Sequence, residues 1–186
     1  MRLNRNTIIT LIILIVVAAL YRVIPQRPMG FAPHWAMALF GGAVIKDKRL
    51  AFAFPIFSMF ISDLLYHLLY INGLTELAGF YEGQLLNYLL FAGMTVIGFM
   101  MRKITVVNIA IFSVIVCVAF FLISNFFVWY GGGGWARPHT FQGLMMSYED
   151  GLPFFRNSIY ATLAFSALLF GAWRFFSVRK EKVIAG

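Results

Sequence analysis

One carboxylate lies inside the long apolar stretches of this sequence, and it is the first residue that could do chemistry there. Asp63 falls in the second half of the apolar range Leu50–Tyr70. An ionisable side chain within an apolar span is costly, so it is a functional candidate by default. Arg156, near the start of another apolar range, carries the opposite charge. The two residues could form a buried ion pair that only joins two helices, or they could contact a ligand, and the sequence leaves both interpretations open.

Further polar side chains occur near the same ends of the expected helices. Tyr66 and His67 follow Asp63 at helical spacing and share its face. Because the other polar groups fall at a similar depth, we predict an outward-facing polar pocket. Its candidate substrate-binding residues are Asp63, Tyr66, His67, Tyr81, Asn87, Asn125 and Arg156. The alternatives are that the tyrosines belong to an aromatic belt at the membrane surface, and that His67 is hydrogen-bonded to Asp63.

The sequence lacks the motifs of zinc metalloproteases, serine hydrolases and ATPases. It contains no H-E-x-x-H zinc motif, no G-x-S-x-G nucleophile elbow and no phosphate-binding loop. Asp63 has no second carboxylate within a span to form a catalytic dyad. We therefore expect no enzyme, no catalytic or metal-binding residues and no cofactor. Cys117, the single cysteine, is expected to be a packing residue.

Composition predicts that membrane-spanning helices position these residues. Of 186 residues, 61% are apolar and 12% charged, and the mean hydropathy is +0.83, whereas soluble domains carry about 25% charged residues. We expect one integral membrane domain over residues 1–186: an all-α, polytopic helix bundle with about six transmembrane helices. The second helix is too short for a full span of ~20 residues, and the first is expected to be retained rather than cleaved as a signal peptide. The expected ranges are Thr7–Ile24, His34–Ile45, Leu50–Tyr70, Gln84–Met101, Thr105–Tyr130 and Leu152–Phe176.

Basic residues predict the orientation, because they concentrate in cytoplasmic loops. If the chain starts inside, 11 lie inside and 4 outside. The inner set is Arg2, Arg5, Lys46, Lys48, Arg49, Arg102, Lys103, Arg174, Arg179, Lys180 and Lys182, and the outer set is Arg22, Arg27, Arg137 and Arg156. We therefore expect both termini in the cytoplasm. The scatter of these charges between apolar runs also argues against a nucleic-acid partner, although the net charge is +8.

Small residues mark possible helix contacts. Ala38 and Gly42 lie four apart in the second range, as do Ala167 and Gly171 in the sixth. They predict either close packing within the bundle or the docking of a partner's helices. The glycine run Gly131–Gly134 is similarly open to two interpretations, a mobile cover over the pocket or a plain linker.

Several stretches in this order resemble a bacterial family of small membrane proteins related to the substrate-binding S components of energy-coupling-factor (ECF) vitamin transporters, most closely to solitary cobalamin S components. The resemblance covers most of the chain. The stretches are Gly30–Pro33 leading into Ala36–Ala43, Ser62–Leu65, Ser124–Phe126 with Val128 and Trp129, and Leu152–Ser158.

The resemblance implies an S-component-like fold of six helices in the bacterial inner membrane, taking up a vitamin-like molecule from outside. It assigns substrate contacts to Asp63, Tyr81 and Arg156, and an ECF energising module as a partner. The relatives carry a cysteine near the outer face as a cobalt ligand. Residues 72–83 contain none here, and His67 and His139 are the alternative ligands for a corrinoid. The competing hypothesis is a structural or assembly subunit of a larger membrane complex without a transport role.

Overall fold

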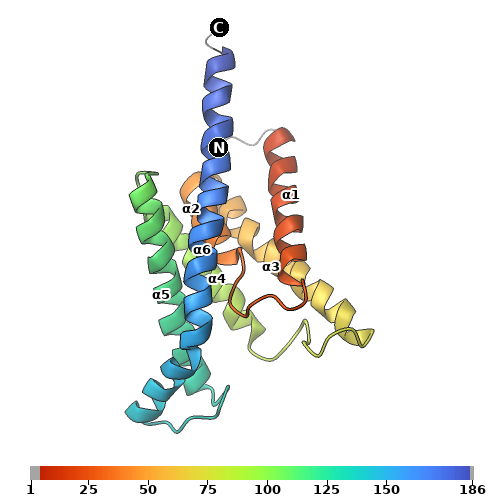
Figure 1. The fold of residues 1–186 in the computed structure, drawn as a ribbon, viewed down its shortest axis with the longest axis vertical. Helices are drawn as coiled ribbons and strands as arrows, with labels where there is room; N and C mark the ends of the chain where they lie inside the picture. The colour runs from red at the N-terminus through yellow and green to blue at the C-terminus, as the bar shows by residue number, and fades with distance from the viewer. Residues whose placement is uncertain (1–4, 185–186) are drawn as a thin grey trace.

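The protein is an all-α bundle of six helices. The computed structural model describes the backbone of residues 5–184 and the side chains of residues 8–175, and no strand occurs over that backbone. This confirms the expected fold class. In chain order the helices are α1 (Arg5–Arg22), α2 (His34–Val44), α3 (Lys48–Ile71), α4 (Gln84–Met100), α5 (Val106–Tyr130) and α6 (Phe141–Ile184) (Figure 1).

Each expected range overlaps one helix, and the largest difference lies in α6. This helix begins at Phe141 rather than at Leu152 and contains Pro153. The residues before Leu152 include Glu149 and Asp150, so a search for an apolar span could not include them. The expected range thus described the apolar part of α6 and missed the helical turns that precede it.

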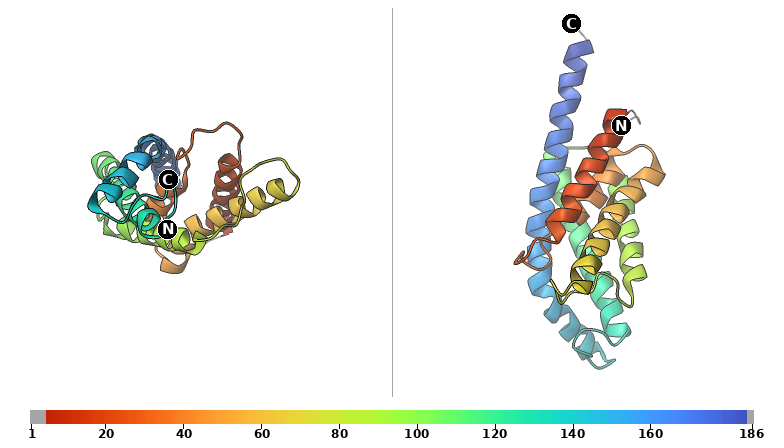
Figure 2. Two further views of the ribbon diagram at one scale, coloured as in Figure 1. Left: turned by 90° about the horizontal axis from the view of Figure 1, so that it is seen from below. Right: turned by 90° about the vertical axis from the view of Figure 1, so that its right-hand side faces the viewer.

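Length and composition allow three of the helices to cross a membrane. These are Lys48–Ile71, Val106–Tyr130 and Phe141–Phe175, and shorter apolar helices cover Ile8–Arg22, His34–Val44 and Gln84–Met100. The chain direction alternates along the bundle. The longer connections, residues 23–33, 72–83 and 131–140, therefore lie at one end, and residues 45–47 and 101–105 lie at the other (Figures 1 and 2). The start of α1 and the end of α6 share the end with the short connections.

The short helix α2 is the centre of the bundle. It packs against α3, α4, α5 and α6, and ten of its eleven residues are buried. Eleven residues of helix extend about 16 Å, roughly half the thickness of a hydrocarbon core. Because protein surrounds α2, its ends need not reach the membrane surface, which explains how so short an apolar helix is accommodated.

The non-helical residues before α2 are held by side chains of other segments. Asn157 Nδ2 donates to the carbonyl oxygen of Met29 at 2.8 Å, and Ser158 Oγ donates to that of Gly30 at 3.1 Å. Arg27 donates to the carbonyl oxygen of Phe31. Irregular backbone at membrane depth is tolerated where protein satisfies its polar groups. Two of the stretches that carry the family resemblance, Gly30–Pro33 and Leu152–Ser158, therefore contact each other.

The small residues of α2 are packing contacts within the bundle. A Cβ on Gly42 would lie 2.3 Å from the carbonyl oxygen of Thr95, and one on Gly98 would lie 2.6 Å from that of Leu39. Of the two interpretations, close packing within the bundle therefore holds for Gly42, because the backbone of α4 already occupies that face. Gly171 differs, since in the described chain, apart from its two neighbours and the adjacent backbone of α6, no heavy atom lies within 4 Å of a Cβ placed there.

Candidate functional site

Asp63 is the centre of a buried polar cluster formed by α1, α3 and α4. Its side chain forms an ion pair with Arg22, the last residue of α1. Its Oδ2 accepts hydrogen bonds from Gln84 Nε2 at 2.6 Å and from the Tyr88 hydroxyl at 2.7 Å. Arg22 also donates to Ser62 Oγ at 2.7 Å. Asp63 is 1% exposed, so the protein itself supplies the partners that this buried charge requires.

Tyr66 of α3 and Gly79 of the connection between α3 and α4 also lie next to this cluster. The Tyr66 hydroxyl donates to the carbonyl oxygen of Arg22 at 2.7 Å, and the Arg22 guanidinium lies 5.4 Å from the centre of the Tyr66 ring. A Cβ on Gly79 would lie 2.0 Å from the carbonyl oxygen of Asp63. Only glycine therefore allows the connection between α3 and α4 to lie so close to α3.

Of the two interpretations of Asp63 and Arg156, an ion pair between them is excluded by the structure. Asp63 pairs with Arg22, because α1 packs against α3, whereas α6 packs against α5 and α2. Arg156 is exposed, and its guanidinium lies 5.9 Å from the centre of the Tyr160 ring. Arg22 lay near the end of the expected range Thr7–Ile24 and was counted only among the outer basic residues, so the sequence did not identify it as the partner of Asp63.

The other predicted site residues occupy separate places. His67 packs edge-on against Phe80, with ring centres 5.4 Å apart, and the acceptors of Asp63 are used by Arg22, Gln84 and Tyr88. Tyr81 accepts a hydrogen bond from Asn87 at the start of α4. Asn125 lies on α5, where it meets α6 at Gly151. The structure therefore brings Asp63 and Tyr66 together around Arg22 and places Asn125 and Arg156 on other helices.

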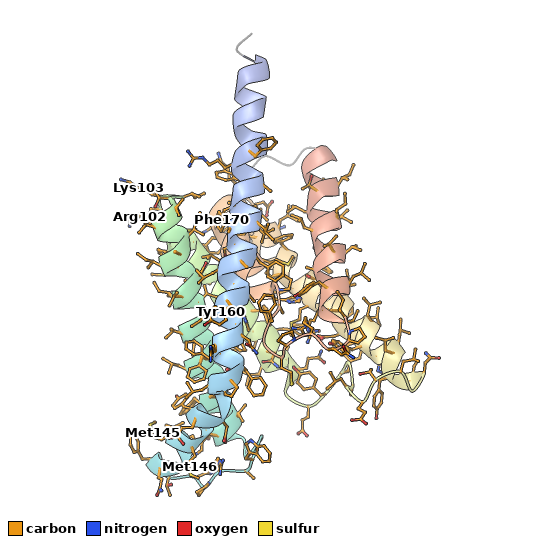
Figure 3. The ribbon with its side chains drawn as sticks, viewed as in Figure 1. Arg102, Lys103, Met145, Met146, Tyr160 and Phe170 are labelled. Carbon is orange, nitrogen blue, oxygen red and sulfur yellow. The ribbon has the colours of Figure 1, made fainter. Side chains whose placement is uncertain are left out.

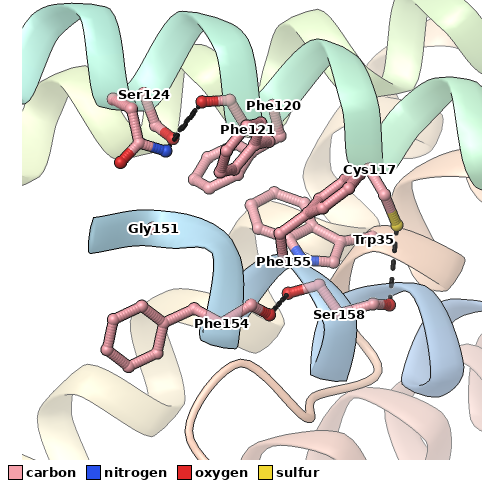
Figure 4. A pocket seen from close by; sticks show the side chains of 10 residues that line it. Trp35, Cys117, Phe120, Phe121, Ser124, Gly151, Phe154, Phe155 and Ser158 are labelled. Carbon is pink, nitrogen blue, oxygen red and sulfur yellow. Dashed lines mark hydrogen bonds between the residues drawn. The ribbon is translucent and has the colours of Figure 1, made fainter. Parts of the chain in front are cut away.

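A pocket of about 180 Å³ lies between α2, α5 and α6 (Figure 4). Aromatic rings form much of its wall: Trp35 lies 3.8 Å from Phe120 between ring centres, and Phe121 lies 4.5 Å from Phe155. Polar atoms lie among these rings. The lining residues are Trp35, Cys117, Phe120, Phe121, Ser124, Asn125, Gly151, Phe154, Phe155 and Ser158.

The side-chain oxygen of Asn125, Oδ1, can still accept a hydrogen bond at this pocket. Its Nδ2 donates to the carbonyl oxygen of Phe121 at 2.8 Å, which fixes the orientation of the amide. Among the described residues no donor reaches its Oδ1. A Cβ on Gly151 would lie 2.5 Å from Oδ1, so any larger residue at this position would collide with the Asn125 amide. A molecule in the pocket could donate a hydrogen bond to Oδ1.

The start of α6 is tied to the end of α5 beside the pocket. Arg137 forms two hydrogen bonds with Asp150, at 2.9 and 2.8 Å, and this contact raises the pKa of the Arg137 guanidinium. Ser147 Oγ donates to the carbonyl oxygen of Asn125 at 3.2 Å, and Trp129 Nε1 donates to that of Pro138 at 2.8 Å. These contacts hold the segment after the glycine run in place.

The chain belongs to the family of unknown function DUF6580. The family model matches residues 2–184, almost the whole chain. No curated protein and no solved structure matches it. Membership therefore assigns no activity, and the resemblance to S components stays a prediction for this DUF6580 protein.

Sequence reasoning found Asn125 but missed most of the pocket in this DUF6580 chain. Trp35, Phe120, Phe121 and Phe155 line it, and each looked like an ordinary residue of an apolar span. Cys117 also lines the pocket and contacts Thr162 Oγ1 at 3.2 Å, in keeping with its expected packing role. A search for polar groups cannot find a pocket whose wall is aromatic. The available signal was the density of aromatic residues near Asn125.

Proposed function

We propose that this protein is an S-component-like membrane subunit that binds a small vitamin-like molecule for uptake. The observation that carries the proposal is the aromatic pocket between α2, α5 and α6, with the free Oδ1 of Asn125 beside it. Aromatic walls with a few convergent polar groups are typical of small-molecule sites. The chemistry fits a flat ring system that carries one hydrogen-bond donor.

The size of the pocket favours a single-ring or fused-ring molecule over a corrinoid. About 180 Å³ is below the roughly 300–1,000 Å³ of pockets that hold drug-sized ligands. A corrin macrocycle with its side chains needs several times this volume. We therefore propose a smaller vitamin-like ligand than the closest resemblance implied.

The proposed setting is the bacterial inner membrane, with both termini in the cytoplasm. The 11 to 4 division of basic residues supports this orientation. The pocket then lies toward the outer half, beside the connection between α5 and α6. In the competing hypothesis, a structural subunit of a larger complex, the open face of α6 at Gly171 is the functional feature.

A thermal-shift screen of the purified protein against single-ring and fused-ring vitamins tests the proposal. We expect at least one compound to raise the melting temperature of the wild type. Asn125→Ala should weaken its binding about tenfold, because one buried hydrogen bond is lost.

Asn72→Ala is the matched control for this variant. Asn72 Nδ2 donates to the carbonyl oxygen four residues earlier, at 2.7 Å from Leu68, just as Asn125 does to Phe121, but Asn72 is exposed at the end of α3. Asn72→Ala should leave binding unchanged. A screen without any stabilising compound, or equal binding by both variants, would reject the pocket as the site.

A further inference from the structure

A second hollow lies at the opposite end of the bundle, between the start of α5 and the second half of α6. It is a groove of about 510 Å³. Its lining is apolar except at one end, where Arg174 takes part. The lining residues are Ile104, Val106, Ile109, Ala110, Leu163, Ala167, Phe170, Gly171, Trp173 and Arg174.

The rim of this groove is positively charged. Arg174 lines it, and Lys103 directly precedes the lining residue Ile104. Figure 3 shows Arg102 and Lys103 at about the level of Phe170 along the bundle. Within the part of the chain that the structure describes, none of these three basic side chains forms an ion pair or hydrogen bond. Asp47, the acidic residue of the other short connection, is already engaged by the backbone N–H groups of Arg49 and Leu50.

We propose that this groove binds an anionic phospholipid, with one acyl chain along α6 and the phosphate at Arg174 and Lys103. The stretch from Leu163 to Arg174 extends about 16 Å along the helix axis, a length that suits an acyl chain. The missing side chain at Gly171 deepens the groove beside this path. Basic pockets between membrane helices at the cytoplasmic surface are suited to anionic headgroups.

The charges favour a lipid over a second copy of the chain. A symmetric contact through this face would place Arg174 and Lys103 near their own counterparts, and like charges brought together oppose association. A soluble anion would use the basic rim but would leave the apolar groove without a role. A phospholipid matches both parts of the surface, and this inference does not depend on the vitamin pocket.

Native mass spectrometry tests the proposal on protein reconstituted with phosphatidylcholine alone or with added phosphatidylglycerol. We expect the wild type to retain phosphatidylglycerol in preference to phosphatidylcholine. Arg174→Gln and Lys103→Gln should each weaken retention about fivefold, the effect of one basic residue near an anionic headgroup. Gly171→Leu should also remove the lipid by filling the groove.

Two variants serve as matched controls. Arg49→Gln removes an exposed charge at the same end of the bundle but on α3, and Gly93→Leu adds a side chain at an open position on α4. Both should retain the lipid, and size-exclusion profiles verify that every variant is folded. Equal retention of the two lipids, or equal retention by all variants, would overturn the proposal. Loss of a copurifying protein from Gly171→Leu, with the lipid unchanged, would assign the groove to a protein partner instead.

Discussion

At the scale of single residues, the contacts of Asp63 predict a role in stability. The carboxylate is buried and has Arg22, Gln84 and Tyr88 as partners. Removing one member of a buried ion pair leaves the other charge without compensation. We expect Asp63→Asn to lower the free energy of unfolding by about 3 kcal/mol, measured by denaturant unfolding in detergent. Arg22→Gln should cost a similar amount, and the double variant less than the sum.

Arg156→Gln is the control for this prediction. It also removes one charge, but from an exposed side chain whose guanidinium lies 5.9 Å from the centre of the Tyr160 ring. The change in unfolding free energy should stay within about 0.5 kcal/mol. If Asp63→Asn instead keeps the wild-type stability and abolishes vitamin binding, the buried cluster is a ligand site, as the sequence suggested.

The sequence located these residues but not their partners. Asp63 was identified because a charged side chain in an apolar span is energetically unfavourable, and helical spacing placed Tyr66 on the same face of the helix. Arg156 was the partner considered for Asp63 and Arg22 was not, because hydropathy does not reveal which helices are neighbours. Gln84 was visible only as one polar residue at the start of a helix, although it forms the 2.6 Å contact with the carboxylate.

At the scale of elements, the contact between α2 and α4 depends on two glycines. Gly42 and Gly98 allow the two backbones to approach, with a Cβ on Gly42 only 2.3 Å from the carbonyl oxygen of Thr95. We expect Gly42→Leu to destabilise the bundle by about 3 kcal/mol, because the added side chain would clash with backbone atoms of α4, which cannot move away by changing rotamer. Melting temperature and size-exclusion profile in detergent measure the effect.

Gly93→Leu provides the comparison on the same pair of helices. Gly93 lies on α4 and is exposed. In the described chain, apart from its two neighbours and the adjacent backbone of α4, no heavy atom lies within 4 Å of a Cβ placed there. Its stability should therefore remain near that of the wild type. A Gly42→Leu protein that melts like Gly93→Leu would show that α2 and α4 can separate without cost, against the packing described above.

The positions of the helices were more predictable than their roles. Apolar run length alone placed one helix in each expected range, including the short α2. The central position of α2 could not be predicted, because burial inside a bundle and exposure to lipid favour the same residue types. The turns Phe141–Gly151 of α6 were missed for the converse reason, since their polar residues interrupt the apolar pattern although the helix continues.

At the scale of the whole molecule, charge and connection length are arranged along the same axis. The short connections, residues 45–47 and 101–105, carry Lys46, Arg102 and Lys103, whereas residues 72–83 contain no basic residue. Sequence could predict this arrangement because the positive-inside rule uses residue identity and order alone. The pocket and the basic groove lie toward opposite ends, and only the folded structure shows this separation.

Reporter fusions test the orientation on which both proposals depend. We expect a reporter after residue 186 to be cytoplasmic and one within residues 72–83 to be exported, because basic residues concentrate at the first end. A third fusion within residues 101–105 should match the C-terminal one, since residues 101–105 and the last turns of α6 lie at the same end of the bundle (Figure 2). Reporters at residues 186 and 72–83 on the same side would contradict the six-span topology.

A reversed result, with the reporter after residue 186 exported and the one within residues 72–83 cytoplasmic, would mean that the pocket opens to the cytoplasm. Uptake from outside would then be excluded, whereas the six-helix bundle would remain consistent with the result. The expected result places Arg174 and Lys103 at the inner leaflet, where the basic groove would meet anionic headgroups.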